Sequence, residues 1–190
     1  MSKTQLSKVI PALLVLFVLA SGFQQQPLKK VKVTEFLSMQ VPEHFSPMSQ
    51  QDMNQKYQTY RLPVAMYTDP NRVVDLGINR SFTTWQADDI QLVHSFYKAT
   101  VLNIYTDVQM ITDEVRNING RDYVVLEFVG TVKDEQGASF RSNKQVSKYQ
   151  YLLYTIYENN SLVINFNAPA RYQPQWQETA RAMMQSVVIK

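Results

Sequence analysis

One stretch of the chain decides the fold class: residues 117–169, NINGRDYVVLEFVGTVKDEQGASFRSNKQVSKYQYLLYTIYENNSLVINFNAP. Apolar and other side chains alternate along this stretch in several runs, as they do in β-strands. Asn119-Gly120 lies between two such runs, and this dipeptide favours the two-residue turn of a β-hairpin. Polar residues at 134–137 and 158–161 separate the later runs. The stretch therefore predicts an antiparallel meander.

Both faces of the predicted sheet carry apolar side chains. In the run after the first turn, Leu126 and Phe128 fall on one face, and Val125 and Val129 fall on the other. The last run places Leu162, Ile164 and Phe166 opposite Val163, Asn165 and Asn167. A sheet that is apolar on both faces has to be covered on both. We therefore expect the α+β class, with an antiparallel sheet sandwiched by helices.

Two amphipathic helices are available to cover the sheet. Asp88 opens the first helix, and Gln91 three residues later completes a plausible capping pair. The second helix spans residues 175–186, with Trp176 on its core side. Apolar positions at helical spacing give the first helix a wide stripe: Leu92, Val93, Phe96, Tyr97, Thr100, Val101 and Ile104.

The chain before the first long helix predicts smaller elements. Alternating apolar residues at 36–42 predict a first strand that ends at a proline. A polar run at 49–56 suggests a short helix, and residues 64–68 and 73–79 read as two further strands. At the end of the chain, residues 187–189 form either a short edge strand or the packed end of the last helix.

The N-terminal segment reads as a secretory signal peptide. Lys3 and Lys8 precede the apolar run 12–20, which is shorter than the roughly 20 residues that span a bilayer. Cleavage after Ala20 or Gly22 suits the small residues there. An uncleaved anchor is the alternative. Because the chain contains no cysteine, neither the lipid attachment of a bacterial lipoprotein nor a disulfide is possible.

We therefore expect three parts: the signal peptide at 1–22, a flexible lead-in at 23–35 and a single domain at 36–190. Removing the signal peptide lowers the formal charge from +3 to +1, because two lysines leave with it and no acid does. A nearly neutral domain argues against nucleic acid as a partner. The expected location is periplasmic or secreted, with no stable membrane anchor after cleavage.

No catalytic or metal-binding motif occurs in the sequence. His44 and His94 have no partner nearby in the chain, and the five glycines are too scattered to hold a phosphate. We therefore expect no cofactor, no metal and no catalytic residue. The alternative is a carboxylate site built from Asp113, Glu114, Glu127 or His94. It requires at least two of these groups to meet in a cleft.

Tyrosines are concentrated in the third run of the meander. Tyr149, Tyr151 and Tyr157 fall on one face of the predicted strand, Tyr154 falls on the other, and Tyr123 is a candidate cross-strand neighbour. One interpretation packs these rings beneath a helix, with the hydroxyl groups at the rim. The other leaves part of the face of Tyr123, Tyr149, Tyr151 and Tyr157 open, as a surface that binds a protein or a small ligand.

The order of elements, together with a few local sequences, resembles a known superfamily. The local sequences are VPEHF at 41–45, Asn119-Gly120, FNAP at 166–169, Trp176 near the start of the last helix and Ser186-Val187 at its end. Over residues 36–190 this pattern resembles the PsbP-like superfamily, which includes the extrinsic photosystem subunits, the Ran-binding Mog proteins and the periplasmic DcrB-like proteins. The resemblance implies an α/β/α sandwich and a binding or accessory module rather than an enzyme.

Two functional hypotheses follow. The first is an exported, non-enzymatic accessory or binding protein of the cell envelope, which acts through protein–protein or small-ligand contacts. Its partner would be another envelope or secreted protein. The second is a small exported hydrolase or carbohydrate-active enzyme with the carboxylate site described above.

Overall fold

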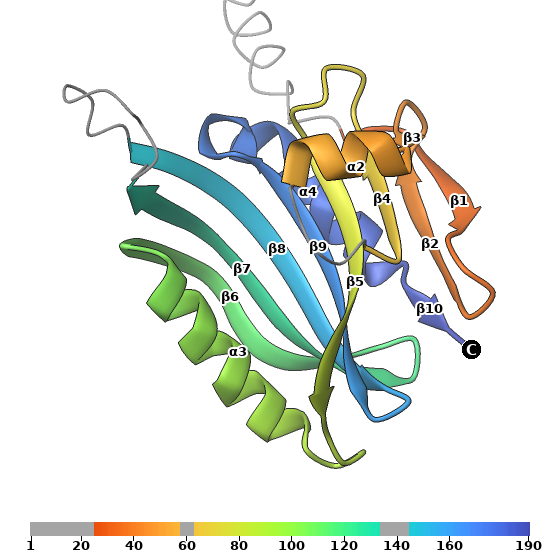
Figure 1. Ribbon diagram of the computed structural model, residues 1–190, viewed down its shortest axis with the longest axis vertical. Helices are drawn as coiled ribbons and strands as arrows, with labels where there is room; N and C mark the ends of the chain where they lie inside the picture. The colour runs from red at the N-terminus through yellow and green to blue at the C-terminus, as the bar shows by residue number, and fades with distance from the viewer. Residues whose placement is uncertain (1–24, 58–62, 134–144) are drawn as a thin grey trace, which may run out of the picture.

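The computed structural model describes residues 25–57, 63–133 and 145–190, which form two antiparallel sheets and several helices (Figure 1). The signal peptide predicted at 1–22 and the polar turn predicted at 134–137 lie outside the described residues. The seven-stranded sheet has the order β3-β4-β5-β9-β8-β7-β6, and the three-stranded sheet has the order β1-β2-β10. The strands are β1 (Leu28–Lys32), β2 (Leu37–Pro42), β3 (Ser46–Pro47), β4 (Ala65–Thr68), β5 (Asp75–Thr84), β6 (Asp107–Ile118), β7 (Arg121–Lys133), β8 (Gln145–Tyr157), β9 (Asn160–Pro169) and β10 (Val188–Ile189). The helices are α2 (Gln50–Tyr57), α3 (Ile90–Ile104) and α4 (Gln173–Gln185), with a 3₁₀ turn η2 (Ala170–Tyr172) before α4.

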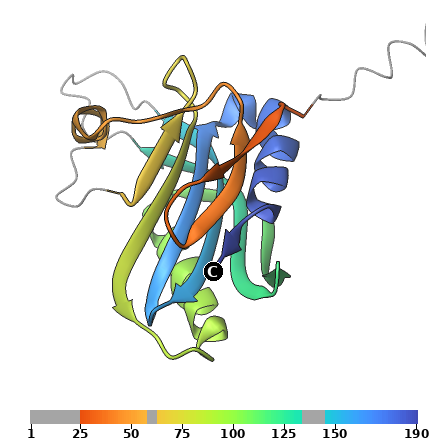
Figure 2. The ribbon, with the colours of Figure 1, turned by 90° about the vertical axis from the view of Figure 1, so that its right-hand side faces the viewer.

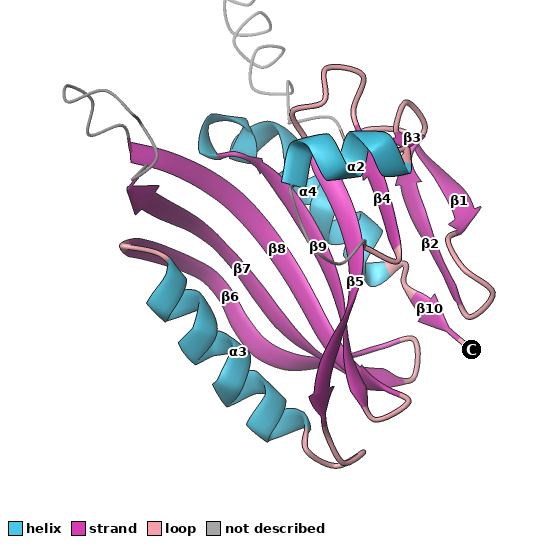
Figure 3. Ribbon diagram, in the orientation of Figure 1, coloured by secondary structure: helices cyan, strands magenta, loops and turns pink. Residues whose placement is uncertain are grey.

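Helices lie on both faces of the seven-stranded sheet (Figure 3). On one face α3 packs on β6, β7 and β8 through Val93, Tyr97 and Val101. The other face is covered by α4 and by β2 of the small sheet, which lie beside each other (Figure 2). The α+β class and the sandwich predicted from the sequence are therefore confirmed. The meander contributes buried residues to both hydrophobic cores.

The predicted Asn119-Gly120 turn is confirmed. Asn119 has φ 52° and Gly120 has φ 86°, so both central residues occupy the left-handed region that a two-residue turn between β6 and β7 requires. The turn between β8 and β9 uses the same conformation without glycine, at Glu158 and Asn159, whose φ angles are 48° and 61°. These two turns set the register of the β6–β7 and β8–β9 pairs.

The folded domain begins before Phe36, which the sequence placed at its start. The part described as a lead-in contains β1, which pairs with β2 from Leu28 opposite Pro42 to Lys32 opposite Ser38. Leu28 and Val31 pack against the core. The lysines of β1 are solvent-facing groups of an edge strand, where charged side chains oppose further pairing.

The capping pair predicted for α3 does not form. The helix begins at Ile90, so Asp89 rather than Asp88 is the N-cap residue, and no side chain caps the helix. The carboxylate of Asp89 instead accepts a hydrogen bond from the backbone N–H of Gln86, at 2.7 Å. The Asp89 carboxylate, which could have capped the first turn of α3, is thus hydrogen-bonded to the loop before the helix.

Only part of the predicted apolar stripe of α3 is buried. Val93, Tyr97 and Val101 form the contact with the sheet, whereas Leu92 and Phe96 are 57% and 45% exposed. A single helix on a sheet contacts it through one narrow face, so the flanking apolar positions of α3 extend beyond the contact. The predicted width of the stripe was therefore wrong.

A buried carboxylate fastens α4 to the sheet. Glu127 of β7 is 1% exposed and lies beneath α4. Its two oxygens accept hydrogen bonds from Tyr149 Oη (2.9 Å), Gln177 Nε2 (2.7 Å), Arg181 Nε (3.1 Å) and Thr112 Oγ1 (3.1 Å). Three strands and one helix therefore meet at one charge, which Arg181 neutralises.

We expect Glu127→Leu to lower the free energy of unfolding by about 3 kcal/mol, because it leaves the buried hydroxyl of Tyr149 without its acceptor and the Arg181 charge with the exposed Glu178 as its remaining partner. Glu114→Gln on β6 is the matched control: Glu114 is exposed and pairs with Arg116, so its loss should cost less than about 1 kcal/mol. Urea unfolding of both variants measures the difference, and equal losses would contradict this role of Glu127.

Candidate functional site

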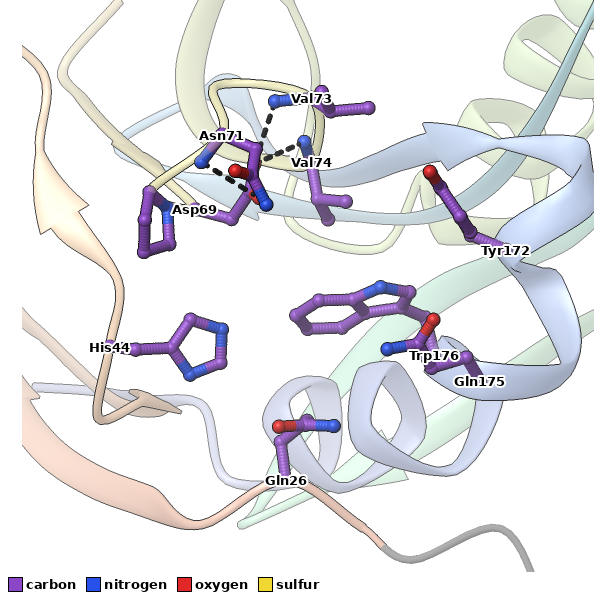
Figure 4. A pocket seen from close by; sticks show the side chains of 10 residues that line it. Gln26, His44, Asp69, Asn71, Val73, Val74, Tyr172, Gln175 and Trp176 are labelled. Atoms are coloured by element: carbon purple, nitrogen blue, oxygen red, sulfur yellow. Dashed lines mark hydrogen bonds between the residues drawn. The ribbon is translucent and has the colours of Figure 1, made fainter.

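A cavity of about 390 Å³ opens where the turn after β2, the β4–β5 loop and the start of α4 meet. We call it the His44–Trp176 cavity. Figure 4 shows the rings of His44 and Trp176 on either side of the hollow, with Gln26 on one flank and the β4–β5 loop on the opposite one. The lining also includes Asn71, Tyr172 and Gln175.

Trp176 is a core residue that shows one side to this cavity. Its ring centroid lies 5.5 Å from that of Phe45, 5.6 Å from that of Phe166 and 5.9 Å from that of His44. The core packing of Trp176 agrees with its predicted place on the inner side of the last helix. Because the indole is clamped by Phe45 and Phe166, it presents a rigid aromatic wall.

The β4–β5 loop is held by the buried carboxylate of Asp69. Its oxygens accept the backbone N–H groups of Asn71 (3.2 Å), Val73 (2.7 Å) and Val74 (2.7 Å). Arg72 adopts a left-handed conformation with φ 58° between them. Asp69 thus fixes the loop conformation that places Asn71 at the cavity, and its own hydrogen-bonding capacity is used inside the loop.

The groups left at the cavity surface are neutral. Asn71, Gln26 and Gln175 offer amides that both donate and accept, and Tyr172 offers a hydroxyl. His44 is exposed and packs against Phe45 with 5.3 Å between ring centroids. The cavity therefore combines aromatic walls with uncharged hydrogen-bonding groups, which is the usual make-up of a small-molecule site.

Two of the four residues of the predicted carboxylate site, His94 and Asp113, come together, and Glu114 and Glu127 lie apart from them. His94 Nε2 lies 2.5 Å from Asp113 Oδ1, and Lys98 pairs with the other oxygen of Asp113. Burial opposes ionisation of Asp113, but the hydrogen bonds from Lys98 and His94 outweigh it and lower its pKa. Glu114 pairs with Arg116, and Glu127 lies on the opposite face of the sheet.

No metal centre is present in residues 25–57, 63–133 and 145–190, since no three His, Asp or Glu side chains there come close enough to hold an ion. In the same part of the chain, no helix has the length and apolar character needed to cross a membrane.

The tyrosines singled out in the sequence are core residues rather than an open surface. Tyr123, Tyr149 and Tyr151 are at most 1% exposed, and Tyr157 is half-buried in a stack with Phe36, 4.5 Å between centroids. Burial raises the pKa of Tyr123 to about 12 and raises that of Tyr149, where the nearby Glu127 charge adds to the effect. The interpretation that packs these rings beneath a helix is the one that the structure supports.

Sequence reasoning missed most of the cavity lining. Asp69, Pro70 and Asn71 lay in the turn between the strands predicted at 64–68 and 73–79, Tyr172 lay before the last predicted helix, and Gln175 was its first residue. The one available signal was the density of Asp, Pro and Asn in that turn, since an Asx side chain that bonds its own loop often orders a functional segment.

Comparison with known proteins places the fold. No protein-family model matches the sequence, and no curated protein matches it either. Among solved structures, cyanobacterial PsbP from Synechocystis superimposes with a TM-score of 0.58 at 13% identity, covering 90% of this chain and 97% of that protein. The chain has the PsbP-like fold. The resemblance drawn from the sequence is thereby confirmed.

Two further structures share the PsbP-like fold. LpqN of Mycobacterium tuberculosis, described as involved in cell envelope biogenesis, gives a TM-score of 0.54 at 14% identity, with 86% of this chain and 91% of LpqN covered. The Ran-binding protein Mog1p of Saccharomyces cerevisiae gives 0.50 at 12% identity, with 87% and 96% covered. At these identities the likeness concerns the fold.

We expect Tyr123→Phe to leave the free energy of unfolding unchanged or to raise it by up to about 1 kcal/mol, because the buried Tyr123 hydroxyl has no hydrogen-bond partner in the described part of the chain. Tyr149→Phe should lower it by about 1 to 2 kcal/mol, because its hydroxyl donates to Glu127. Urea unfolding at neutral pH compares them; a larger loss for Tyr123→Phe would contradict the burial of an unpaired hydroxyl.

The stability of the wild type and that of Tyr123→Phe should respond differently to alkaline pH. The folded pKa of Tyr123, about 12, exceeds the unfolded value near 10, so its contribution to stability is complete below pH 10 and is lost as pH rises towards 12. Tyr123→Phe should therefore gain about 1 kcal/mol relative to the wild type by pH 11. Unfolding measured at pH 8 and at pH 11 tests the sign.

Proposed function

We propose that the protein is an exported, non-enzymatic binding protein that takes a small neutral ligand in the His44–Trp176 cavity. The observation that carries the proposal is the hydrogen bonding of Asp69, whose carboxylate is the one among the residues that line the cavity. Within the described part of the chain, its carboxylate oxygens accept hydrogen bonds from backbone N–H groups of its own loop. Amides and aromatic rings are left to contact a ligand.

The chemistry of the lining narrows the ligand class. Amide groups pair with hydroxyl or amide groups of a ligand, because each can donate and accept. The clamped Trp176 and the adjacent His44 favour a ligand with one flat or apolar side. A sugar ring or a small amide combines these properties, and a cavity of about 390 Å³ accommodates either.

Binding rather than catalysis is supported by the surroundings of His44, the imidazole that lines the cavity. His44 makes no hydrogen bond to a carboxylate in the described residues, so nothing there orients its ring for proton transfer. Proteins with the same fold point the same way: one is named for binding Ran and another is described by a role in envelope biogenesis. Export is inferred from the signal peptide read at 1–22.

The test is a titration of the full chain with neutral mono- and disaccharides and small amides, followed by tryptophan fluorescence and amide chemical shifts. His44→Ala and Gln175→Ala should each weaken binding by about tenfold, the loss of one good contact. Gln185→Ala, on an exposed position at the far end of α4, should bind like the wild type.

An absence of binding across this panel would contradict the small-ligand proposal. So would equal weakening by His44→Ala and Gln185→Ala, since only His44 lines the cavity. Far-UV circular dichroism of each variant separates lost contacts from lost folding.

A second candidate function, docking of a protein partner, is favoured by the outer side of α3. Leu92 and Phe96 lie one turn apart on this helix and are both largely exposed. Phe96 is supported from below by Trp85 and Tyr97, with centroid distances of 5.6 and 5.0 Å. An exposed aromatic ring on a rigid base is a typical anchor of a protein interface.

We expect Leu92→Gln to abolish capture of a specific partner from envelope or secreted fractions of the source, because it places an amide in the apolar contact. Leu102→Gln is the matched control, because Leu102 is 51% exposed on another side of the same helix. Quantitative mass spectrometry of the captured proteins compares the two. Retention of the partner by Leu92→Gln, or equal loss in both variants, would argue against this surface.

A further inference from the structure

A second cavity lies on the other side of the β4–β5 loop. Its volume is about 300 Å³, and it is bordered by the end of α2, the loop, the start of β8 and the end of β9. We call it the Lys148 cavity. Val73 of the loop borders this cavity and also the His44–Trp176 cavity, so one segment separates two sites.

The Lys148 cavity gathers positive charge around one carboxylate. Lys56, Arg72 and Lys148 all line it, and Asp75 is the single acidic residue among the lining groups. Asp75 is 1% exposed, and Lys56 Nζ lies 2.9 and 2.7 Å from its two oxygens. This ion pair cancels one positive charge with the one negative charge.

Asp75 has no capacity left for a ligand. Besides Lys56, it accepts hydrogen bonds from Thr68 Oγ1 at 2.7 Å and from the hydroxyl of Tyr57. The hydroxyl of Tyr57 is thereby fixed, and burial raises its pKa, with the adjacent carboxylate adding to the rise. The carboxylate of Asp75 therefore belongs to the wall of the cavity, and its negative charge is paired within the protein.

The other two cations differ in how they are paired. Arg72 forms an ion pair with Asp52 of α2, and its backbone carbonyl accepts from Lys56 Nζ at 2.8 Å. The side chain of Lys148 has no ion-pair or hydrogen-bond partner in residues 25–57, 63–133 and 145–190, although the residue is half-buried. The cavity therefore has one cation whose charge the described structure leaves uncompensated.

An uncharged donor completes the arrangement. Asn167 of β9 lines the same cavity, and its side-chain amide makes no hydrogen bond to another described residue. The ammonium group of Lys148 supplies up to three donors and the amide of Asn167 supplies two. Such a pair suits a group with several acceptor oxygens and a negative charge, because hydrogen bonds between ionised partners are the strong ones.

We propose that Lys148 and Asn167, beside the Lys56–Asp75 pair and Arg72, form a binding site for a compact oxyanion: a phosphate group, or the chemically similar carboxylate. The volume suits a single such group with a short attachment and is small for a nucleotide. This site is distinct from the His44–Trp176 cavity, and its test does not depend on the proposed function.

The experiment follows amide chemical shifts and thermal stability of the full chain during titration with inorganic phosphate and with acetate, against chloride at equal ionic strength. Shifts should concentrate at Ser147, Lys148 and Asn167, and phosphate should raise the midpoint of unfolding above chloride. Lys148→Gln and Asn167→Ala should each weaken phosphate binding by about tenfold or more. Lys30→Gln, the same charge change on exposed β1, should have no effect.

The source of the anion is resolved by a second arm. Sedimentation with vesicles of phosphatidylcholine containing phosphatidylglycerol tests a phosphate carried by a lipid. Loss of vesicle binding in Lys148→Gln, but not in Lys30→Gln, assigns the site to a lipid phosphate. Binding of free phosphate alone, with the same variant dependence, assigns it to a soluble ligand. The proposal is overturned if phosphate and acetate act like chloride and vesicles are not bound, or if Lys148→Gln behaves like Lys30→Gln.

Discussion

The ion pair between Glu127 and Arg181 is the interaction on which the architecture of one whole layer depends. A charge at 1% exposure is costly unless it is paired and fully hydrogen-bonded, and Glu127 receives four donors from three different elements besides its own strand. Two of these donors come from α4, so the helix can satisfy the charge in only one rotation and one position along the sheet. Apolar packing alone would allow a helix to slide. The position of α4 in turn places Trp176, near the start of the helix, against Phe45 and Phe166. There its ring forms a wall of the His44–Trp176 cavity.

A buried carboxylate that is satisfied by hydrogen bonds also holds each end of the β4–β5 loop. Asp69 and Asp75 are both buried carboxylates, but they are satisfied in different ways. Backbone N–H groups of the loop satisfy Asp69, so it shapes the chain locally. A lysine from α2 satisfies Asp75, so it ties the loop to a distant element. Between them the loop is rigid enough to separate two cavities with different electrostatics.

Local spacing in the sequence was enough to predict a hairpin turn and the two faces of a strand. The Asn119-Gly120 turn and the alternation of Leu126 with Val125 need no tertiary information, because hairpin geometry and strand pleat determine them. Prediction from the sequence failed where the structure of a residue depends on a contact with a residue far along the chain. The tyrosine spacing could not show that Tyr149 points at Glu127 beneath α4, and the lysines of β1 concealed a strand whose pairing partner is β2. The cavity brings together residues from 26 to 176, and no local pattern marks such a set.

The distribution of carboxylates favours the proposed binding role over acid–base catalysis. Each buried acid in the described part of the chain has a structural role, since Asp69 holds a loop, Asp75 anchors Lys56, and Glu127 anchors Arg181. Asp113, which is less buried, is engaged by Lys98 and His94, and these hydrogen bonds lower its pKa away from the range that a general base at neutral pH requires. A catalytic carboxylate needs an environment that leaves its proton exchangeable near the working pH. The environment of Asp113 does the opposite, because the hydrogen bonds from Lys98 and His94 stabilise its ionised form. The groups that line the two cavities without such partners are amides, aromatic rings and the ammonium group of Lys148, and this set suits the proposed binding role.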